Sequence, residues 1–288
     1  MNKRTSVIVF LLPALLILLA IAIVPTVKAI IMSFQNRSLF FATSSFVGFS
    51  NYKEAFFDPR FINALKVSAI WELLTVLGSM SFATSLAVFT FEYCPLQVKR
   101  VLRVLMILPI TVPRVSASFI WKFIYSPVVG LTNYFLSIFS IQPVALLSNN
   151  TTALFAVAWV DIWQWGSLFG VIILGVLESL PKNKLEAARI DGANLYQLYR
   201  YIVLPWILMP VISLTLVKGV QSLRAFDYIY IMTKGGPGIS TETLDMYIYN
   251  VGINIGGELS YASSMSVLLL ILTLLAFGSI WRVVQGAN

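Results

Sequence analysis

The sequence contains no histidine and only one cysteine, Cys94. A single thiol cannot form a disulfide within the chain, and the lack of histidine excludes histidine-based catalysis and the usual zinc sites. Charged residues are also few, at 11% of 288 residues, whereas a soluble domain has about a quarter. Hydrophobic residues make up 58%, which is more than one membrane anchor needs. We therefore predict an all-α, polytopic membrane protein without a metal site.

Two catalytic motifs are missing as well. No G-x-x-x-x-G-K-[ST] phosphate loop occurs, so the chain is not expected to hydrolyse ATP itself. The H-E-x-x-H motif of metalloproteases is impossible without histidine. The net charge of +8 could indicate a nucleic-acid partner, but the basic residues are scattered beside apolar segments. A membrane topology signal explains that scatter better, so we expect neither an enzyme nor a nucleic-acid-binding protein.

Six apolar segments are long enough to cross a bilayer, which takes roughly 20 residues. The first begins at Val7, is too long for a usual signal peptide, and is followed by no small-x-small cleavage site. The predicted membrane helices lie at about 7–31, 65–91, 101–123, 152–177, 206–232 and 260–282. The sequence thus predicts a single transmembrane domain over residues 1–288, with its core helices between about 65 and 282.

Orientation follows from the Lys and Arg residues near the ends of these helices. With six spans, both termini share one side of the membrane, and that side carries most of the basic residues. They are Lys3, Arg4, Lys99, Arg100, Arg103, Lys182, Lys184, Arg189, Arg200 and Arg282. The other side holds Arg37, Lys53, Arg60 and Lys234, mostly in a longer loop where charge counts less. We expect cytoplasmic termini and a cytoplasmic loop over residues 178–205.

Proline interrupts the third predicted helix. Pro109 and Pro113 lie close together, and Arg114 follows them. Prolines free backbone carbonyls, which a membrane tolerates only against protein or a wet cavity. Lys122 is expected to extend outward. Segments 33–60 and 124–151 are predicted to be exported loops, and residues 235–238 a tight turn after the fifth helix.

A charged stretch, EAARIDGANLYQLYRYIVLP at 186–205, lies between two apolar segments. Its pattern predicts two short helices. Asn183 can cap the first with Glu186 as its capping-box partner. Gly192 can end that helix, because glycine adopts the left-handed conformation without penalty.

The second helix of this stretch has its own signals. Asn194 can cap it, with Gln197 three residues later, and Pro205 is expected to stop it. Its apolar stripe consists of Leu195, Leu198, Tyr199 and Ile202. By pattern alone, such an amphipathic loop could equally pack on its own helix bundle.

The same stretch resembles the EAA loop of binding-protein-dependent ABC importer permeases. The matching residues are Glu186, Ala187, Ala188, Asp191, Gly192, Ala193, Ile202, Leu204 and Pro205, with Tyr199 where that family usually has Phe. Three further segments resemble the sugar-importer (maltose/glycerol-phosphate-type) branch: FVGFSNY at 46–52, DPRF at 58–61 and FDYIYIMTKGGPGISTETL at 226–244.

This resemblance implies a type I ABC importer permease with six membrane helices, in a bacterial or archaeal cytoplasmic membrane. Its implied partners are a second, related permease, two ABC ATPase subunits and an extracytoplasmic solute-binding protein. ATP and Mg would bind the ATPase subunits, and this chain would hold no cofactor. The implied ATPase-coupling residues are Glu186, Ala187, Ala188, Asp191, Gly192 and Ala193.

The resemblance also implies a solute path. In maltose-type permeases, sugar contacts lie on the helix before the EAA loop and on the helix before the GG-P motif. The matching positions here are Asp161, Trp165 and Leu168, then Gln221, Ser222 and Ala225, with Gln164 and Arg224 as polar neighbours. Aromatic faces, amides and carboxylates together suit a sugar, but none of these positions keeps the maltose-type residue. A sugar or oligosaccharide is expected, without its identity.

Several alternatives stay open at this point. Arg224 and Asp227 could form a local i, i+3 ion pair, and Trp163 and Trp165 could be interfacial anchors. A proton-coupled secondary transporter is less favoured, because it needs inverted repeats and ionisable relays near the midplane.

An anionic solute, such as glycerol phosphate or an acidic sugar, is the main alternative to a neutral sugar. Three basic residues predicted to lie within the membrane, Arg114, Lys218 and Arg224, could neutralise a phosphate or carboxylate.

Overall fold

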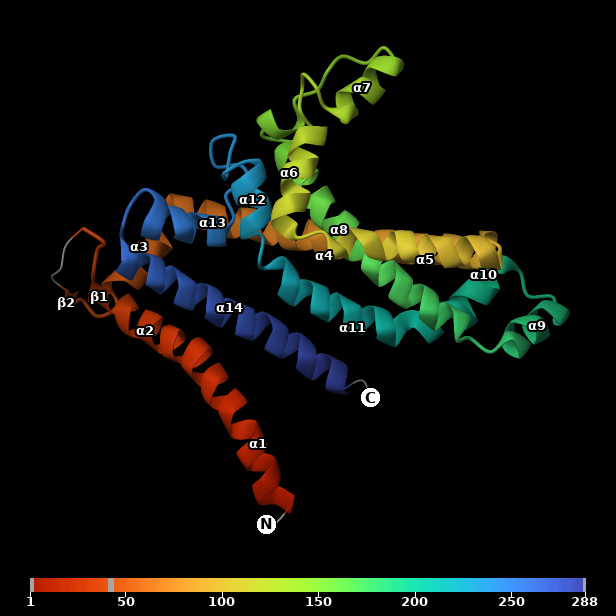
Figure 1. Cartoon of the computed structure of the whole chain (residues 1–288), viewed down its shortest axis with the longest axis horizontal. Helices are drawn as coiled ribbons and strands as arrows, with labels where there is room; N and C mark the ends of the chain where they lie inside the picture. The colour runs from red at the N-terminus through yellow and green to blue at the C-terminus, as the bar shows by residue number, and fades with distance from the viewer. Residues whose placement is uncertain (1–2, 41–43, 287–288) are drawn as a thin grey trace. The chain divides into compact units, whose positions relative to one another are not determined.

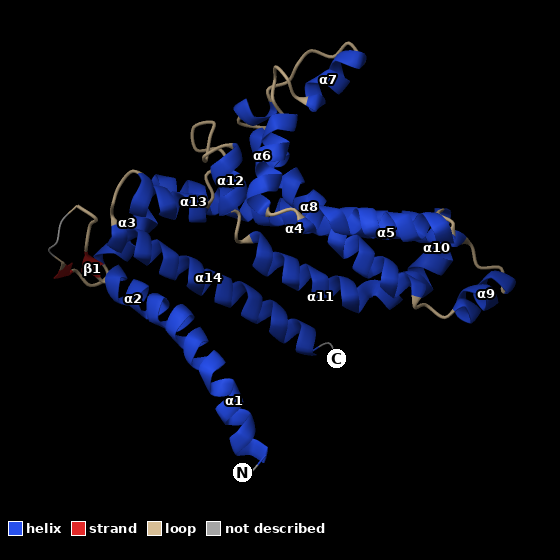
Figure 2. Ribbon diagram, in the orientation of Figure 1, coloured by secondary structure: helices blue, strands red, loops and turns tan. Residues whose placement is uncertain are grey.

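The computed structural model describes residues 3–40 and 44–286, and nearly all of them are helical (Figures 1 and 2). The α-helices are α1 (Lys3–Leu18), α2 (Val24–Ser33), α3 (Ser50–Phe57), α4 (Pro59–Tyr93), α5 (Leu96–Thr111), α6 (Arg114–Ile124), α7 (Leu131–Ile138), α8 (Ala153–Glu178), α9 (Lys182–Ile190), α10 (Leu195–Leu198), α11 (Leu204–Ser222), α12 (Phe226–Met232), α13 (Leu244–Tyr249) and α14 (Leu259–Gly286). The π-helical turns are η1 (Leu19–Ile23), η3 (Tyr199–Val203) and η4 (Asn250–Asn254), and η2 (Leu146–Ser148) is a 3-10 turn. The all-α prediction is confirmed.

The chain divides into two compact units. One contains residues 1–62 and 247–288, and the other contains residues 63–246. The prediction of one domain over residues 1–288 stays a prediction.

In the first unit, α2 and α3 pack against α14. Two-residue strands β1 (Gln35–Asn36) and β2 (Ser45–Phe46) pair antiparallel, with Gln35 opposite Phe46. Asn51 donates from its side-chain amide to the carbonyls of Ser33 and Gln35, each at 2.8 Å. The predicted loop over 33–60 is thus partly ordered by local hydrogen bonds.

Asp58, the acidic residue of the DPRF segment, accepts hydrogen bonds from two tyrosines in the same unit. Tyr261 donates to an Asp58 carboxylate oxygen at 2.9 Å, and Tyr247 donates to the same oxygen. Burial alone raises the pKa of Asp58, but these hydroxyl groups and two backbone N–H groups outweigh it, so the pKa is lowered overall. Asp58 therefore joins the start of α4 to α13 and α14 within this unit.

In the second unit, α8 is the central helix, and it packs against α5, α6, α11 and α12. In the most apolar 18-residue stretch of α8, 56% of the residues are buried. The corresponding share is 33% for α4 and 22% for the helix that contains α11. Glycine allows the close approach: a Cβ at Gly166 would lie 2.8 Å from Phe82 and 3.2 Å from the Ser79 carbonyl oxygen. Small residues at helix contacts are the usual means of packing in membranes.

Within residues 3–40 and 44–286, four continuous helical segments are long and apolar enough to cross a membrane: Leu11–Ser33, Pro59–Tyr93, Ala153–Glu178 and Leu195–Ser222. They match the first, second, fourth and fifth predicted spans. The apolar part of α14 described here, Leu259–Leu275, is shorter and lies within the sixth.

The third predicted span needs a correction. It is two helices, α5 and α6, bent by 101° at residues 112 and 113. Val112 and Pro113 have extended backbones, with ψ of 122° and 142°. The physical reason is that Pro113 has no N–H to continue the helix and its ring disfavours helical geometry in Val112.

The fifth predicted span is also shifted. The helix that includes α11 ends at Ser222, and α12 is separate, so a span over 206–232 is wrong at its C-terminal end. It begins earlier than predicted because Pro205 does not stop a helix. In the π-turn η3, the Leu204 N–H donates five residues back to Tyr199, and Pro205 then occupies the first turn of α11, where its missing N–H is tolerated.

The turn predicted at residues 235–238 is confirmed. Gly235 and Gly238 have φ of +90° and +57°, a region that glycine enters without strain. The turn follows α12 rather than the fifth predicted span.

Candidate functional site

The candidate site lies between two apolar clusters in the second unit. Along α8, the buried hydrophobic residues between 154 and 160 belong to one cluster, and those between 169 and 177 belong to the other. The predicted path residues Asp161, Gln164, Trp165 and Leu168 fall between them, spaced i, i+3, i+4 and i+7 on one helix face. The α8 helix therefore presents a polar band in an otherwise apolar interior.

Asp161 forms an ion pair with Lys218. The sequence did not indicate this pairing. The Lys218 ammonium lies 2.6 Å from a carboxylate oxygen of Asp161, and the two side chains are 0% and 2% exposed. The pair joins α8 to α11 across 57 positions of sequence. Burial of both charges is tolerated because they neutralise one another.

Gln164 stabilises the break in the third span. Its amide nitrogen donates to the carbonyl oxygens of Pro109 at 2.9 Å and Val112 at 2.7 Å. In an uninterrupted helix the N–H of residue 113 would bond the Pro109 carbonyl, but residue 113 is proline. Tyr228 donates to the Gln164 carbonyl oxygen at 2.7 Å, so this buried amide is fully engaged by the protein.

Arg114 is the first residue of α6 after that break. Its guanidinium donates to the Arg224 carbonyl oxygen at 3.0 Å and reaches Gln221 Oε1 at 3.4 Å. It also lies 6.0 Å from the Trp165 ring centre and 5.7 Å from that of Tyr228. This residue brings the candidate positions of α8 and α11 together.

The two tryptophans of the fourth span lie in different surroundings. Trp165 packs on Phe169 with ring centres 5.5 Å apart, and its buried indole N–H has no hydrogen-bond partner among the described atoms. Trp163 packs on Trp121, also at 5.5 Å. Trp165 thus faces the two cations Arg114 and Lys218, inside the bundle.

The C-terminal end of α11 carries the second set of candidates. The Ser222 hydroxyl donates to the Glu72 carboxylate, and the Ser222 carbonyl accepts from the Trp71 indole at 2.9 Å. Ala225 is buried in the first apolar cluster. Leu168 is partly buried against the second cluster on α8. Ala225 and Leu168 therefore make apolar packing contacts and no side-chain hydrogen bonds.

Arg224 and Asp227 do not form the local ion pair that was left open. Among the described residues, neither is ion-paired with the other. The reason is that α11 ends at Ser222 and α12 begins at Phe226, so the helical i, i+3 geometry is lost between them.

Sequence reasoning missed Glu72, Trp71 and Tyr228 as members of this site. Glu72 had a usable signal, because an acidic residue inside an apolar span is costly and usually functional or paired. Tyr228 and Trp71 had none, since buried aromatic residues are common in such helices.

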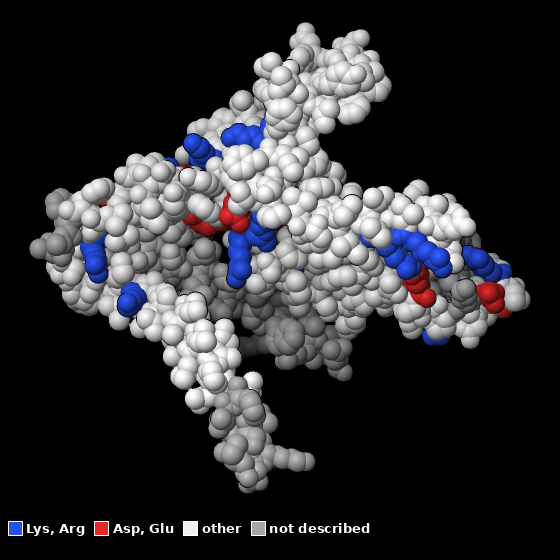
Figure 3. Space-filling model, in the orientation of Figure 1, with Lys and Arg blue, Asp and Glu red and all other residues white. Residues whose placement is uncertain are grey.

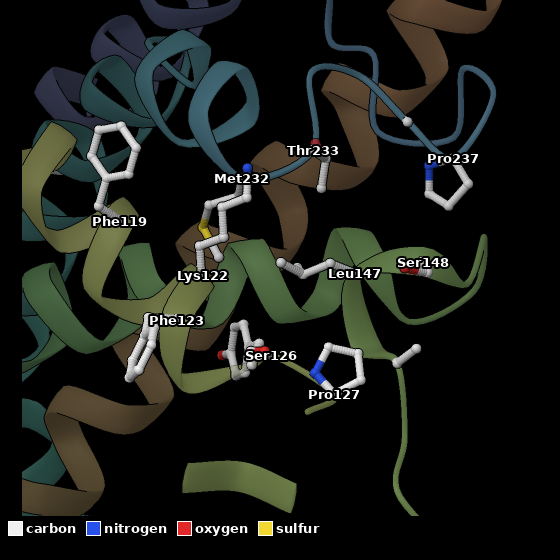
Figure 4. Close-up of a pocket in the computed structure, with 13 residues that line it drawn as sticks. Phe119, Lys122, Phe123, Ser126, Pro127, Leu147, Ser148, Met232, Thr233 and Pro237 are labelled. Carbon is white, nitrogen blue, oxygen red and sulfur yellow. The ribbon is translucent and has the colours of Figure 1, made fainter. Parts of the chain in front are cut away.

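A cavity of about 860 Å³ lies elsewhere in the second unit (Figure 4). It is bounded by α6, the segment before α8 and the turn after α12, with Phe119, Leu147 and Pro237 among its lining residues. Lys122 also lines it, and its ammonium donates to the Ile231 carbonyl at 2.8 Å. The predicted path residues do not line this cavity.

The charged stretch forms a helical hairpin at one end of the second unit. Figure 3 shows basic and acidic side chains gathered at the end that carries α9 and α10. Glu186, Asp191 and Gly192 are exposed there, and Ile190 is 86% exposed.

The ends of the two helices in this hairpin follow the prediction with one exception. Gly192 has φ of +81°, and the Ala193 N–H donates to the Ala188 carbonyl at 2.9 Å, a Schellman-type end. Asn194 and Gln197 form the predicted capping box. The cap at Asn183 is wrong: α9 already begins at Lys182, with no side-chain cap.

Similarity to known proteins identifies the family. Residues 83–286 match the family described as binding-protein-dependent transport system inner membrane component. The chain belongs to this family. The resemblance to importer permeases is thereby confirmed, and the chain is a transport permease rather than a catalytic enzyme.

Three curated relatives illustrate the similarity. A probable ABC transporter permease of Sinorhizobium fredii is 30% identical over 290 residues, covering 99% of this chain and 92% of the relative. The trehalose/maltose permease MalF of Thermococcus litoralis is 30% identical over 265 residues, covering 92% and 88%. The sn-glycerol-3-phosphate permease UgpA of Agrobacterium fabrum is 32% identical over 255 residues, covering 88% and 86%.

A solved structure shares the fold. It is a bacterial ABC transporter involved in import of the acidic polysaccharide alginate, with a TM-score of 0.85 and 20% identity, covering 98% of this chain and 96% of the other. At that identity the likeness concerns the fold, which is that of a type I importer permease.

Proposed function

We propose that this permease forms half of the solute path of an ATP-driven importer for a sugar or oligosaccharide. The observation that carries the proposal is the group of Arg114, Trp165 and Gln221 at the break of the third span, since charged residues within membrane segments mark solute pathways. The relatives named for trehalose/maltose and glycerol phosphate support the solute class. The face of Trp165 and the Gln221 amide are suited to sugar rings and hydroxyls.

The proposed partners are a second related permease, two ABC ATPase subunits and an extracytoplasmic solute-binding protein. The family's description includes binding-protein dependence, and a similar solved complex contains a periplasmic protein bound to alginate pentasaccharide. ATP and Mg belong to the ATPase subunits in this proposal. The chain spans a bacterial or archaeal cytoplasmic membrane, with both termini in the cytoplasm.

Coupling to the ATPase is proposed for the hairpin of α9 and α10, through Glu186, Ala187, Ala188, Asp191, Gly192 and Ala193. Two features support this role: the hairpin is exposed, and the turn at Gly192 and the capping box at Asn194 give it a fixed shape. A rigid, charged element can transmit the motion of an ATPase, provided that ATP binding favours one state of the permease over the other.

We expect Glu186→Lys to uncouple transport, because it reverses a charge on the exposed face of α9. The measurement is solute uptake and solute-stimulated ATP hydrolysis in proteoliposomes, with the permease, ATPase and binding protein encoded beside this gene. Uptake should fall at least tenfold while the assembled complex is recovered normally. Asn183→Ala is the matched control, since Asn183 is exposed on the same helix and, among the described residues, its side chain accepts only from the neighbouring Lys184 N–H. Normal uptake in Glu186→Lys would refute the coupling role.

A further inference from the structure

We propose that the imported solute carries an anionic oxygen group, a carboxylate, sulfate or phosphate, and that Arg114 selects for it. This inference rests on the proposed function and narrows its solute class. It rests on the direct contacts of the three cations that were candidates for binding an anion, Arg114, Lys218 and Arg224. Glu72, the other carboxylate of the site, accepts from the Ser222 hydroxyl and touches none of them in an ion pair.

Lys218 is not available to a solute. Its ammonium is fully buried and bonded to Asp161 at 2.6 Å. A buried pair of this kind is neutral as a unit, and removing either member would leave an uncompensated charge. The same bond also engages Asp161, so the most buried acidic residue of the band is not free for a second cation.

Arg114 has only neutral hydrogen-bond partners. Its guanidinium bonds a backbone carbonyl oxygen and a Gln221 amide oxygen, and it makes no ion pair within the described parts of the chain. Buried Asp161 interacts with Arg114 through the electrostatic field, without an ion-pair contact. Arg114 is only partly buried, so its charge is tolerated without a partner, and no acidic residue is in contact with it among the described residues.

The setting of Arg114 suits a planar anion. It lies near the faces of Trp165 and Tyr228, which can hold a guanidinium in place without neutralising it. Arginine presents several N–H groups in a fixed fork that matches carboxylate and phosphate oxygens. The same aromatic side chains could pack on the apolar face of a sugar ring, so one arrangement fits both parts of an acidic sugar.

Arg224 provides a second positive charge at this place. Its side chain is exposed, and the break between α11 and α12 separates it from Asp227, as shown above. The Arg114 guanidinium bonds the Arg224 backbone carbonyl at 3.0 Å, so the two residues are neighbours, and neither forms an ion pair with another described residue. We infer that an anionic solute would meet Arg114 first and Arg224 as a supporting charge.

The test compares charged and neutral forms of the same solutes. The probes are a hexuronic acid trisaccharide, its methyl ester, a hexose 6-phosphate, the parent hexose and maltotriose, each measured by solute-stimulated ATP hydrolysis in proteoliposomes of the complete importer. We expect stimulation by at least one acidic probe and a preference of at least tenfold over its neutral form. Arg114→Gln should remove that preference, and Arg114→Lys should retain part of it.

Lys122→Gln is the matched control, because it removes one positive charge from the same helix outside the polar band and should leave the preference unchanged. Stimulation by neutral saccharides alone would overturn the inference and leave the importer proposal standing. An equal loss for charged and neutral probes in Arg114→Gln would assign Arg114 a structural role and also overturn it. Stimulation by none of the probes would count against both proposals.

Discussion

At the scale of single residues, the polar band contains two kinds of charge. Asp161 and Lys218 neutralise one another in the interior, whereas Arg114 is held by aromatic rings and neutral oxygens. The first arrangement lets both charges be buried, and the second leaves a positive charge for an anion. Residue type alone does not distinguish them, because both lysine and arginine bind anions.

The stabilising role of the Asp161–Lys218 pair can be measured by a double-variant cycle. Asp161→Leu alone should leave the buried Lys218 ammonium without its ion-pair partner. This should lower the free energy of unfolding by about 3–5 kcal/mol and reduce the amount of permease in the membrane. Asp161→Leu with Lys218→Met removes both charges and should restore most of that abundance, because replacement of a buried pair by apolar residues is often nearly neutral. Abundance and thermal unfolding of the purified complex report the result. If the double variant is as poor as the single one, the pair has another role.

At the scale of elements, the broken third span depends on a side chain of the fourth. The carbonyls of Pro109 and Val112 lie at a bend of 101°, and Gln164 donates to both. Each unsatisfied carbonyl in a membrane would cost several kcal/mol. The sequence favoured Gln164 as a solute contact, and that role stays a prediction. The contacts of Gln164 support a role in positioning Arg114, since Arg114 is the first residue of α6 after the bend.

We expect Gln164→Leu to destabilise this bend. The change leaves the Pro109 carbonyl without its side-chain donor, so it should reduce uptake at least tenfold, equivalent to about 1.4 kcal/mol, and lower the unfolding temperature of the complex. Gln164→Glu keeps an acceptor for Tyr228 but, when ionised, cannot donate to the two carbonyls, and should behave like Gln164→Leu. Tyr228→Phe is the milder comparison, because it removes the hydroxyl bond to Gln164 Oε1 and leaves the two Gln164 donor bonds in place. Wild-type uptake and unfolding temperature in Gln164→Leu would show that the bend does not need this donor.

At the scale of the whole molecule, the distribution of Lys and Arg predicts where the α9–α10 hairpin lies. Most basic residues flank one set of helix ends, which predicts a cytoplasmic hairpin and cytoplasmic termini. The side chains of Lys3, Arg4, Lys182 and Arg282, which contribute to this argument, are outside those that the structure describes.

Thiol labelling tests that orientation. With Cys94 replaced by serine, a cysteine introduced at the exposed position Asn183 should react with a membrane-impermeant maleimide only after the cells are opened. The control is a cysteine at Val128, which is 90% exposed in the segment predicted to be exported and should react in intact cells. The reverse pattern at both positions would invert the predicted topology.

The sequence by itself determined the features that depend on neighbours along the chain. Apolar runs fixed most of the membrane helices, and Gly192 and the Asn194–Gln197 capping box fixed the hairpin turn, since those hydrogen bonds join residues at most five positions apart. Only the tertiary structure decided the rest. Lys218 meets Asp161 across 57 positions and Gln164 meets Pro109 across 55, while Arg224 and Asp227, three positions apart, do not pair. Helix packing and the breaks at Pro113 and Ser222 set these distances, and no local pattern encodes them.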